Sequence, residues 1–293
     1  MHVFVTGGTG TIGAPVVAEL LAHGHTVLAL ARSDDSAQAL EKAGAEALRG
    51  ALTDLDVLRA GAARSDGVIS LAFGRDYSTA EALARGIAEE SAALAALGKE
   101  LIGSDRPIVA ASGTPWIPGR VSTEADPLPT EGPVGGRALS QMALLDLASR
   151  RVRSATVRLP RTVHNEGKGG FAGLLTDVAR RTRVSGYPGD GMQRWPAVHA
   201  LDAAVLFRLV LESAPAGTSW HAVADEGDAV RDIATVIGRR LGLPVKEVAQ
   251  EAFGPFGSIF AMDQPASSAH TRQALGWTPT HPGLLADLEN LKP

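Results

Sequence analysis

The chain has 293 residues, of which 45% are hydrophobic, so it can bury the core of one large α/β domain and of a smaller appended one. Its net charge is −4, and the absence of a basic stripe or a polybasic patch argues against nucleic acid and membranes as partners. Cysteine is absent, which excludes disulfides, thiolate metal sites and a cysteine nucleophile.

The N-terminal segment lacks the features of an export signal, because it has no basic region and its apolar residues are those of a predicted strand. No apolar run approaches the roughly 20 residues of a membrane span. We therefore expect a soluble, cytoplasmic protein.

Residues 3–13, VFVTGGTGTIG, join an apolar strand to a glycine-rich turn and then to a helix that begins near Thr11. Gly7 permits a tight turn, Gly10 lets a pyrophosphate approach the backbone, and Gly13 allows the helix to pack closely on the strand. The helix start supplies free N–H groups and a positive dipole end. The pattern predicts a phosphate-binding turn. The expected contacts are Gly7, Thr9, Gly10, Thr11, Ile12 and Gly13.

A second apolar strand at residues 25–31 follows this helix and completes a βαβ unit. The residue after the second strand selects the cofactor, because a carboxylate there binds the ribose of NAD whereas an arginine accommodates the 2′-phosphate of NADP. Arg32 and Ser33 occupy this place. NADP (NADPH) is therefore the predicted cofactor; the alternative is that Arg32 is an ordinary solvated charge.

Strands and helices alternate through the first half of the chain, which predicts a Rossmann-type, doubly wound parallel sheet. Such a sheet binds ligands where its strands end, so the following loops should share one cleft. The expected strands are 46–49, 67–72, 107–111 and 152–159, and the expected helices are 54–63, 79–101 and 140–150. The expected cleft loops are 7–12, 31–35, 51–54, 72–78, 112–137 and 160–170.

The second half is interrupted by glycines and shows helical spacing at 201–211 and 230–241 before a terminal helix. It predicts a smaller C-terminal cap on the substrate side. The expected division is an NADP-binding Rossmann domain at 1–164 plus 193–224 and a substrate-binding cap at 165–192 plus 225–293.

The chain carries, in order, a set of motifs known from one enzyme family. They are residues 6–13 (TGGTGTIG), 67–72 (GVISLA), 111–112 (AS), 157–160 (VRLP), 195–202 (WPAVHALD) and 275–279 (LGWTP). With these motifs the chain resembles, over essentially its whole length, the extended and atypical short-chain dehydrogenase/reductases, which are related to NAD-dependent epimerase/dehydratases.

The resemblance implies an active site with a Ser that hydrogen-bonds the substrate oxygen, a Tyr as general acid or base, and a Lys four residues after the Tyr. Ser112 matches the Ser, but Arg137 and Gln141 stand where the Tyr and Lys are expected. Arginine keeps its proton at physiological pH and so cannot be the proton donor. We expect Gln141 to contact ribose instead. The family's adenine-binding carboxylate is replaced by Ala51.

The remaining expected site residues also follow from the resemblance. Expected cofactor contacts are Leu52, Leu71, Ala72, Phe73, Pro160 and Val163, and expected substrate contacts are Thr114, Trp116, Arg137 and His164. The histidines lack the spacing of metal ligands, so no metal is expected. For Trp116 and His164 the alternative is a structural role.

Two residues are the candidates for catalysis. Ser112 would hold the substrate oxygen, and Tyr77 would donate a proton, with water as the alternative donor. The structural alternatives are a turn-capping hydroxyl for Ser112 and simple packing for Tyr77. A hydrolase is disfavoured, because residues 110–114 (AASGT) lack the first glycine of a nucleophile elbow.

The sequence thus leaves two functions open. The first is an NADPH-dependent oxidoreductase that acts on a small apolar carbonyl compound, and the second is an NADP-binding regulator or ligand-binding protein that has lost the reaction. The resemblance also implies a homodimer through helices at 79–101 and 136–150. Their alanines are equally explained by helix propensity, so the oligomeric state stays open.

Overall fold

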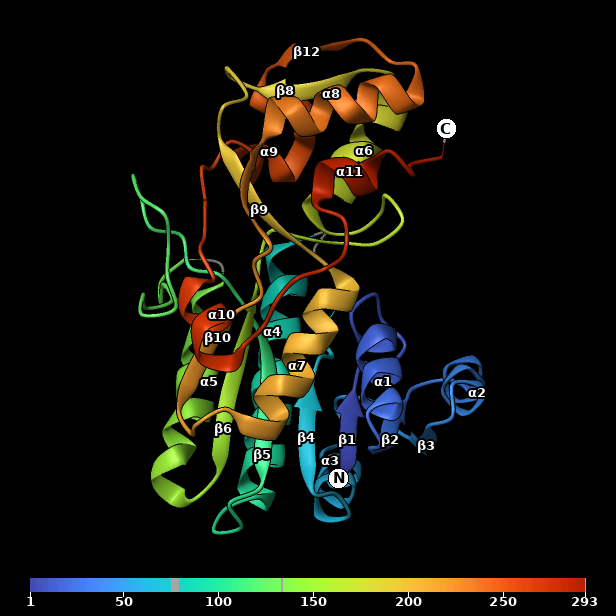
Figure 1. The fold of residues 1–293 in the computed structure, drawn as a ribbon, viewed down its shortest axis with the longest axis vertical. Helices are drawn as coiled ribbons and strands as arrows, with labels where there is room; N and C mark the ends of the chain where they lie inside the picture. The colour runs from blue at the N-terminus through green and yellow to red at the C-terminus, as the bar shows by residue number, and fades with distance from the viewer. Residues whose placement is uncertain (75–78, 133, 293) are drawn as a thin grey trace.

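The computed structural model describes residues 1–74, 79–132 and 134–292. A seven-stranded sheet, parallel at every pairing, forms the lower part of the molecule, and its strands point toward a smaller cap (Figure 1). This confirms the predicted Rossmann-type fold. The strands of this sheet are β1 (His2–Thr6), β2 (Thr26–Ala31), β3 (Glu46–Arg49), β4 (Gly67–Ser70), β5 (Pro107–Gly113), β6 (Arg153–Leu159) and β10 (Thr218–His221).

The strand order is β10-β6-β5-β4-β1-β2-β3, so the winding reverses between β1 and β4. In the register, Val5 of β1 lies beside Ala29 on one side and Ile69 on the other. Ligands of doubly wound sheets bind where the winding reverses, because the loops there diverge and leave a crevice. The carboxyl end of β1 is therefore the expected ligand edge.

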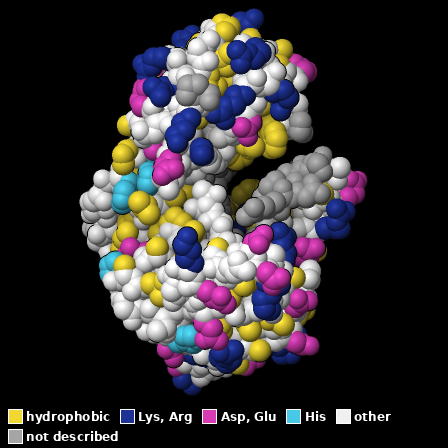
Figure 2. All heavy atoms as spheres, turned by 90° about the vertical axis from the view of Figure 1, so that its right-hand side faces the viewer, with side chains coloured by type: hydrophobic (Ala, Val, Ile, Leu, Met, Phe, Trp, Pro, Cys, Tyr) yellow, Lys and Arg dark blue, Asp and Glu magenta, His cyan; other side chains and the backbone are white. Residues whose placement is uncertain are grey.

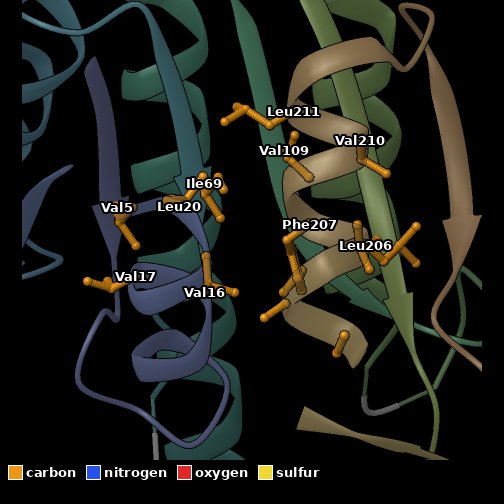
Figure 3. Packing of buried hydrophobic residues seen from close by; sticks show 14 of the residues in the cluster. Val5, Val16, Val17, Leu20, Ile69, Val109, Leu206, Phe207, Val210 and Leu211 are labelled. Carbon is orange, nitrogen blue, oxygen red and sulfur yellow. The ribbon is translucent and has the colours of Figure 1, made fainter. Parts of the chain in front are cut away.

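Helices cover both faces of this sheet (Figure 1). Alternate residues of β1 point to opposite faces: Val3 and Val5 join one buried cluster, and Phe4 joins another. Figure 3 shows the first cluster, in which Phe207 packs toward the strands. One face carries α1 (Gly13–Ala22) and α7 (Ala200–Ser213); the other carries α3 (Leu55–Ala63), α4 (Ala80–Glu100) and α5 (Gly135–Leu145); α2 (Asp34–Lys42) lies beside β3.

The helix predicted at 140–150 begins earlier, at Gly135, and continues after Leu145 as a 3-10 turn, Asp146–Arg150. Two glycines in succession are a poor helix signal, but here packing requires the first and favours the second. A Cβ on Gly135 would lie 2.2 Å from the carbonyl oxygen of Thr130, and one on Gly136 would lie 3.0 Å from Cγ2 of Ile87 in α4. Because of the earlier start, residues 137 and 141 both lie on α5.

The cap has a core of its own, built around Trp195, Phe253 and Phe260. Phe260 makes edge contacts with Trp195 and Phe253, with ring centroids 5.2 and 5.4 Å apart. The cap elements are α6 (Gly170–Thr182), β8 (Ser185–Pro188), α8 (Val230–Leu241), β12 (Val245–Val248), a 3-10 segment (Gln250–Phe256), α9 (Gly257–Phe260) and α11 (Leu284–Leu288), with α10 (Ala269–Leu275) returning beside β10.

A three-stranded sheet joins the cap to the large sheet. Its order is β11-β9-β7, with β7 at Thr162–His164, β9 at Arg194–His199 and β11 at Asp225–Ala229. The division of the chain into 1–164 plus 193–224 and 165–192 plus 225–293 stays a prediction. Within the described part of the chain, no helix is long and apolar enough to cross a bilayer.

Candidate functional site

The end of β1 is tied to the end of β4 by one side chain. Thr6 Oγ1 accepts hydrogen bonds from the backbone N–H groups of Leu71 and Ala72, both at 3.2 Å. Gly7 has a φ of +74°, and a Cβ there would lie 2.8 Å from the nitrogen of Ala72. Only glycine fits this turn, because any side chain would strike the neighbouring strand end. Leu71 and Ala72 therefore border the glycine turn, and their expected contacts with the cofactor stay predictions.

The turn itself presents free donors. The N–H of Gly10 bonds the carbonyl of Gly7 at 3.0 Å, whereas the N–H groups of Thr11 and Ile12 bond no residue that the structure describes. A Cβ on Gly13 would lie 2.0 Å from the Gly7 oxygen, so the helix must start with glycine. The first turn of α1 holds no acidic residue. Uncapped N–H groups at the positive end of a helix suit a phosphate.

Arg32 and Ser33 follow β2, the neighbour of β1 in the sheet, and Leu52 follows β3, the next strand. Arg32 is exposed and forms no ion pair within the described ranges, while its neighbour Asp34 pairs with Arg49 at 3.3 Å. Ser33 caps α2, since its Oγ accepts a hydrogen bond from the N–H of Ser36 at 3.2 Å. Leu52 is half buried and packs against the core under α3. The cofactor contacts expected for Arg32, Ser33 and Leu52 stay predictions.

Ser112 lies near the end of β5, beside Arg158 of β6 in the register. Its side chain is buried, at 6% exposure, and its hydroxyl bonds no other residue in the part of the chain that is described. Thr114 follows it, also buried, with its carbonyl held by the Gln264 side chain at 2.8 Å. The hydroxyl of Ser112 does not cap a turn and is available to a ligand.

Arg137 reaches the same place from α5. Its Nε and Nη2 donate to the two carboxylate oxygens of Glu90 in α4, each at 2.7 Å, and Nη2 also donates to the Ala111 carbonyl at 3.3 Å. The guanidinium lies 4.4 Å from the ring centroid of Phe73. A cation in the first turn of a helix opposes the helix dipole, so the buried carboxylate of Glu90 offsets an unfavourable position.

Gln141 lies one turn further along α5 and is fully buried. Its Nε2 donates to the same Ala111 carbonyl at 3.3 Å, while its Oε1 is buried with no partner in the described structure. A buried unsatisfied acceptor is costly. Arg137 and Gln141, which are expected to stand in place of the family's Tyr and Lys, thus both bond the carbonyl of the residue directly before Ser112.

The geometry does not support the substrate contact expected of His164. Its side chain is 1% exposed, its Nδ1 lies 2.9 Å from an Asp287 oxygen in α11, and its ring makes an edge contact with His199. Burial and the neighbouring His164 lower the pKa of His199. His164 is therefore part of the joint between cap and sheet, the structural alternative, because β7 turns its side chain away from the surface.

The other expected residues are spread around the edge of the sheet. Trp116 is 42% exposed, and its Nε1 donates to the Asp263 carbonyl at 3.0 Å. Pro160 and Val163 are buried after β6. Tyr77 lies outside the described residues. The surface is hollowed between the cap and the sheet (Figure 2). Among the residues described, no three His, Asp or Glu side chains form a metal-binding group.

Two residues at this edge, Glu90 and Arg161, were not predicted from the sequence. Glu90 lies in an alanine-rich helix where its only signal is a charge on an otherwise apolar face. Arg161 follows Pro160 directly after a buried strand, and its side chain is 8% exposed. A charged residue next to a strand end, at a predicted cleft loop, is the signal that could have identified it.

Comparison with known proteins supports a family. The model of the NAD-dependent epimerase/dehydratase family matches residues 3–223. An uncharacterized protein of Schizosaccharomyces pombe is 42% identical over 294 residues, covering 98% of each chain, and one of Saccharomyces cerevisiae is 39% identical over 295 residues, also covering 98% of each.

Solved structures show the same fold. A UDP-glucose 4-epimerase from Stenotrophomonas maltophila with bound NAD superposes with a TM-score of 0.79 at 19% identity, covering 99% of this chain and 96% of that one. A UDP-glucose 4-epimerase from Thermotoga maritima with UDP-glucose gives a TM-score of 0.77 at 18% identity, covering 99% and 97%.

The pair formed by Glu90 and Arg137 yields a stability prediction. Glu90→Gln leaves the guanidinium without its counter-charge, and we expect the free energy of unfolding to fall by about 2 kcal/mol. For a chain of this size that lowers Tm by about 3 °C. Differential scanning calorimetry measures it. The control is Glu46→Gln, whose carboxylate pairs with Arg64 on the surface and contributes little. Equal Tm values for the two variants would contradict a stabilising role for Glu90.

Proposed function

The chain belongs to the NAD-dependent epimerase/dehydratase family, and from this premise we propose that it is an NADPH-dependent oxidoreductase that acts on a small apolar carbonyl compound. The observation that carries the proposal is the hydroxyl of Ser112, which bonds no described residue and belongs to a side chain near the end of β5, at the ligand edge of the sheet. A hydroxyl that bonds no protein group and is not sealed from the surface can donate a hydrogen bond to a ligand.

The residues present fit a dinucleotide. The free N–H groups of Thr11 and Ile12 would bind its diphosphate. A Cβ on Gly10 would have only one protein neighbour, the Gly7 oxygen at 3.3 Å, and would otherwise project into open space. The absence of a side chain at Gly10 therefore keeps that space open for the diphosphate. The orphan Oε1 of Gln141 would accept a hydrogen bond from a ribose hydroxyl. Residues 1–164 and 193–224 would hold the nucleotide, and 165–192 and 225–293 would select the substrate.

When bound, NADPH supplies the hydride. Ser112 would donate a hydrogen bond to the substrate carbonyl oxygen and stabilise the negative charge that develops on it. Arg137, fixed by Glu90, would hold a positive charge beside the Ala111 carbonyl and orient the substrate. The proton for the alcohol product would come from Tyr77 or from water, a choice that rests on the sequence alone.

A second candidate is an NADP-binding regulator or ligand-binding protein. The observation that favours it is the ion pair between Arg137 and Glu90, which fills the position of the expected acid with a group that cannot give up its proton. Gln141 likewise brings no charge to tune a neighbour. Both candidate functions require binding of the nucleotide, but only the oxidoreductase turns over a substrate.

We also propose a homodimer through α4 and α5. Leu139 and Met142 of α5 are 55% and 49% exposed, and residues three apart share one face of a helix. Large apolar side chains side by side on a surface mark a protein contact more often than isolated ones do.

The choice of cofactor is tested at Arg32. We expect wild-type protein to bind NADPH at least about tenfold more tightly than NADH, since a charge-assisted contact to the 2′-phosphate stabilises binding by about 1.5 kcal/mol or more. Arg32→Ala should remove that preference and leave the affinity for NADH unchanged. Nucleotide fluorescence titration measures both. Arg64→Ala, at the opposite end of the sheet, is the control. The same preference in wild type and Arg32→Ala would refute the assignment.

The reaction is tested at Ser112. With an aldehyde or ketone that wild-type protein reduces, Ser112→Ala should lower kcat at least about tenfold with little change in NADPH affinity, because a donor to the developing oxyanion is lost. The rate of NADPH oxidation, followed by absorbance at 340 nm, measures kcat. Tyr77→Phe distinguishes the two possible proton donors, since full activity in that variant assigns the proton to water and not to Tyr77. Unchanged turnover in Ser112→Ala would remove Ser112 from the mechanism, and no turnover by wild type with any carbonyl tested would favour the regulator.

The dimer is tested by placing a charge on its proposed face. Leu139→Glu should convert a dimer into a monomer in analytical ultracentrifugation, because the interface would have to bury an unpaired carboxylate. Met192→Glu, an equally exposed apolar residue of the cap, should leave the dimer intact. A wild-type protein that sediments as a monomer contradicts the proposal.

A further inference from the structure

Arg161 is a buried cation that the proposed reaction does not use. It follows β6 and is 8% exposed. Its Nη1 donates to the carbonyl of Ile259 in α9 at 3.0 Å, and its guanidinium lies 5.1 Å from the ring centroid of Phe171 in α6. Its Nε is buried without a partner, and Nη2 donates to no acceptor in the described ranges. One whole edge of the guanidinium, Nε and Nη2, is therefore unpaired.

The charge of Arg161 also lacks a counter-charge. Arg137 is paired with Glu90, and Arg158 is faced by Asp126 and Glu124. No such carboxylate faces Arg161 among the residues described, and burial lowers its pKa to about 10, which still leaves it protonated at neutral pH. The carbonyl of Ile259 and the ring of Phe171 compensate this buried charge only in part, because no carboxylate faces it and its Nε is buried without an acceptor.

The helix end beside Arg161 is positively polarised, like the guanidinium itself. The N–H of Phe171, in the first turn of α6, donates to the Arg161 carbonyl at 3.2 Å, so the positive end of this helix lies directly beside the residue. That first turn contains no acidic side chain. The N–H groups of Phe171 and Ala172 are bonded to the Arg161 carbonyl and to Thr162 Oγ1, so the helix contributes its dipole and not free donors. The dipole and the guanidinium both favour an anion, and no described carboxylate neutralises them.

Arg161 follows the strand that pairs with the one carrying Ser112. In the pairing of β5 with β6, Ser112 lies beside Arg158 and Gly113 beside Leu159, two residues before Arg161. The contacts of the guanidinium come from α6 and α9 of the cap. The backbone of Arg161 therefore leaves the sheet next to the strand end that carries Ser112, and its side chain contacts the cap expected to select the substrate.

We propose that Arg161 binds an anionic group of the substrate, a carboxylate or a phosphate, through its Nε and Nη2 edge. The proposal rests on the proposed function for the identity of the cleft, and it narrows the substrate to a carbonyl compound with a small apolar body and one anionic end. A carboxylate or phosphate matches this edge because two parallel N–H donors bind two of its oxygens at once.

The test compares two probes of similar size, 2-oxobutanoate and its neutral counterpart 2-butanone, by isothermal titration calorimetry at saturating NADP⁺. Wild-type protein should bind 2-oxobutanoate at least about tenfold more tightly than 2-butanone, as one charge-assisted contact implies. Arg161→Met should abolish this preference. Arg240→Met is the matched control, because Arg240 is a cap arginine that also donates to a main-chain carbonyl, that of Leu291, and it should keep the preference.

The Tm without ligand distinguishes a loss of ligand binding from a loss of folded structure. Because Arg161→Met removes an unpaired buried charge, its Tm without ligand should equal or exceed that of wild type. If this variant does not fold, Arg161→Lys keeps the charge but loses the planar fork and should weaken the preference for 2-oxobutanoate. Inorganic phosphate competes in a parallel titration, and tighter binding of phosphate than of 2-oxobutanoate to wild type, lost in Arg161→Met, assigns the site to a phosphate ester.

Three results would overturn the proposal: equal affinity of wild type for the two probes with no binding of phosphate, an undiminished preference in Arg161→Met, or a loss of NADPH affinity in Arg161→Met, which would assign the anion to the cofactor. A failure of the proposed function has a different signature. It appears as absent NADPH binding or turnover in wild type, whereas the titrations with 2-oxobutanoate and phosphate report on Arg161 without any reaction.

Discussion

The contact between the ends of β1 and β4 is the constraint on which the site depends. Thr6 bonds two backbone N–H groups at the end of β4, and Gly7 turns where any Cβ would strike Ala72. The chain can therefore leave β1 only toward the face covered by α1. That turn leaves the N–H groups of Thr11 and Ile12 unpaired at the crevice where the winding reverses. A nucleotide would meet donors that are already in place and would not have to order them.

The other side of the crevice combines satisfied and unsatisfied groups. Arg137 is fully engaged by Glu90, and both Arg137 and Gln141 hold the Ala111 carbonyl. The hydroxyl of Ser112, by contrast, has no partner in the described structure. A rigid frame around a free group is what a binding or catalytic site requires, because the surrounding shell keeps the free group in position. The frame supports either candidate function, since it positions a ligand whether or not the ligand reacts.

Most of the large sheet could be predicted, because its strands are short apolar runs separated by helical patterns. The edge strand β10 was missed, since residues 218–221 are half polar and only two of the four are buried. The start of α5 was missed because Gly135 and Gly136 are selected by packing against Thr130 and α4, which no local pattern reveals. The cap was predicted to exist but not its strands.

The site was predictable where it depends on the backbone and poorly predictable where it depends on distant side chains. The glycine turn and the position of Ser112 follow from strand ends. The partner of His164 is Asp287, 123 residues later in the chain, so its burial could not be foreseen. The most direct test of the account is a crystal structure of the complex with NADPH. It should show the diphosphate bound by the N–H groups of Thr11 and Ile12 and the nicotinamide beside Ser112. A diphosphate bound away from this turn, or a nicotinamide out of reach of Ser112, would contradict it.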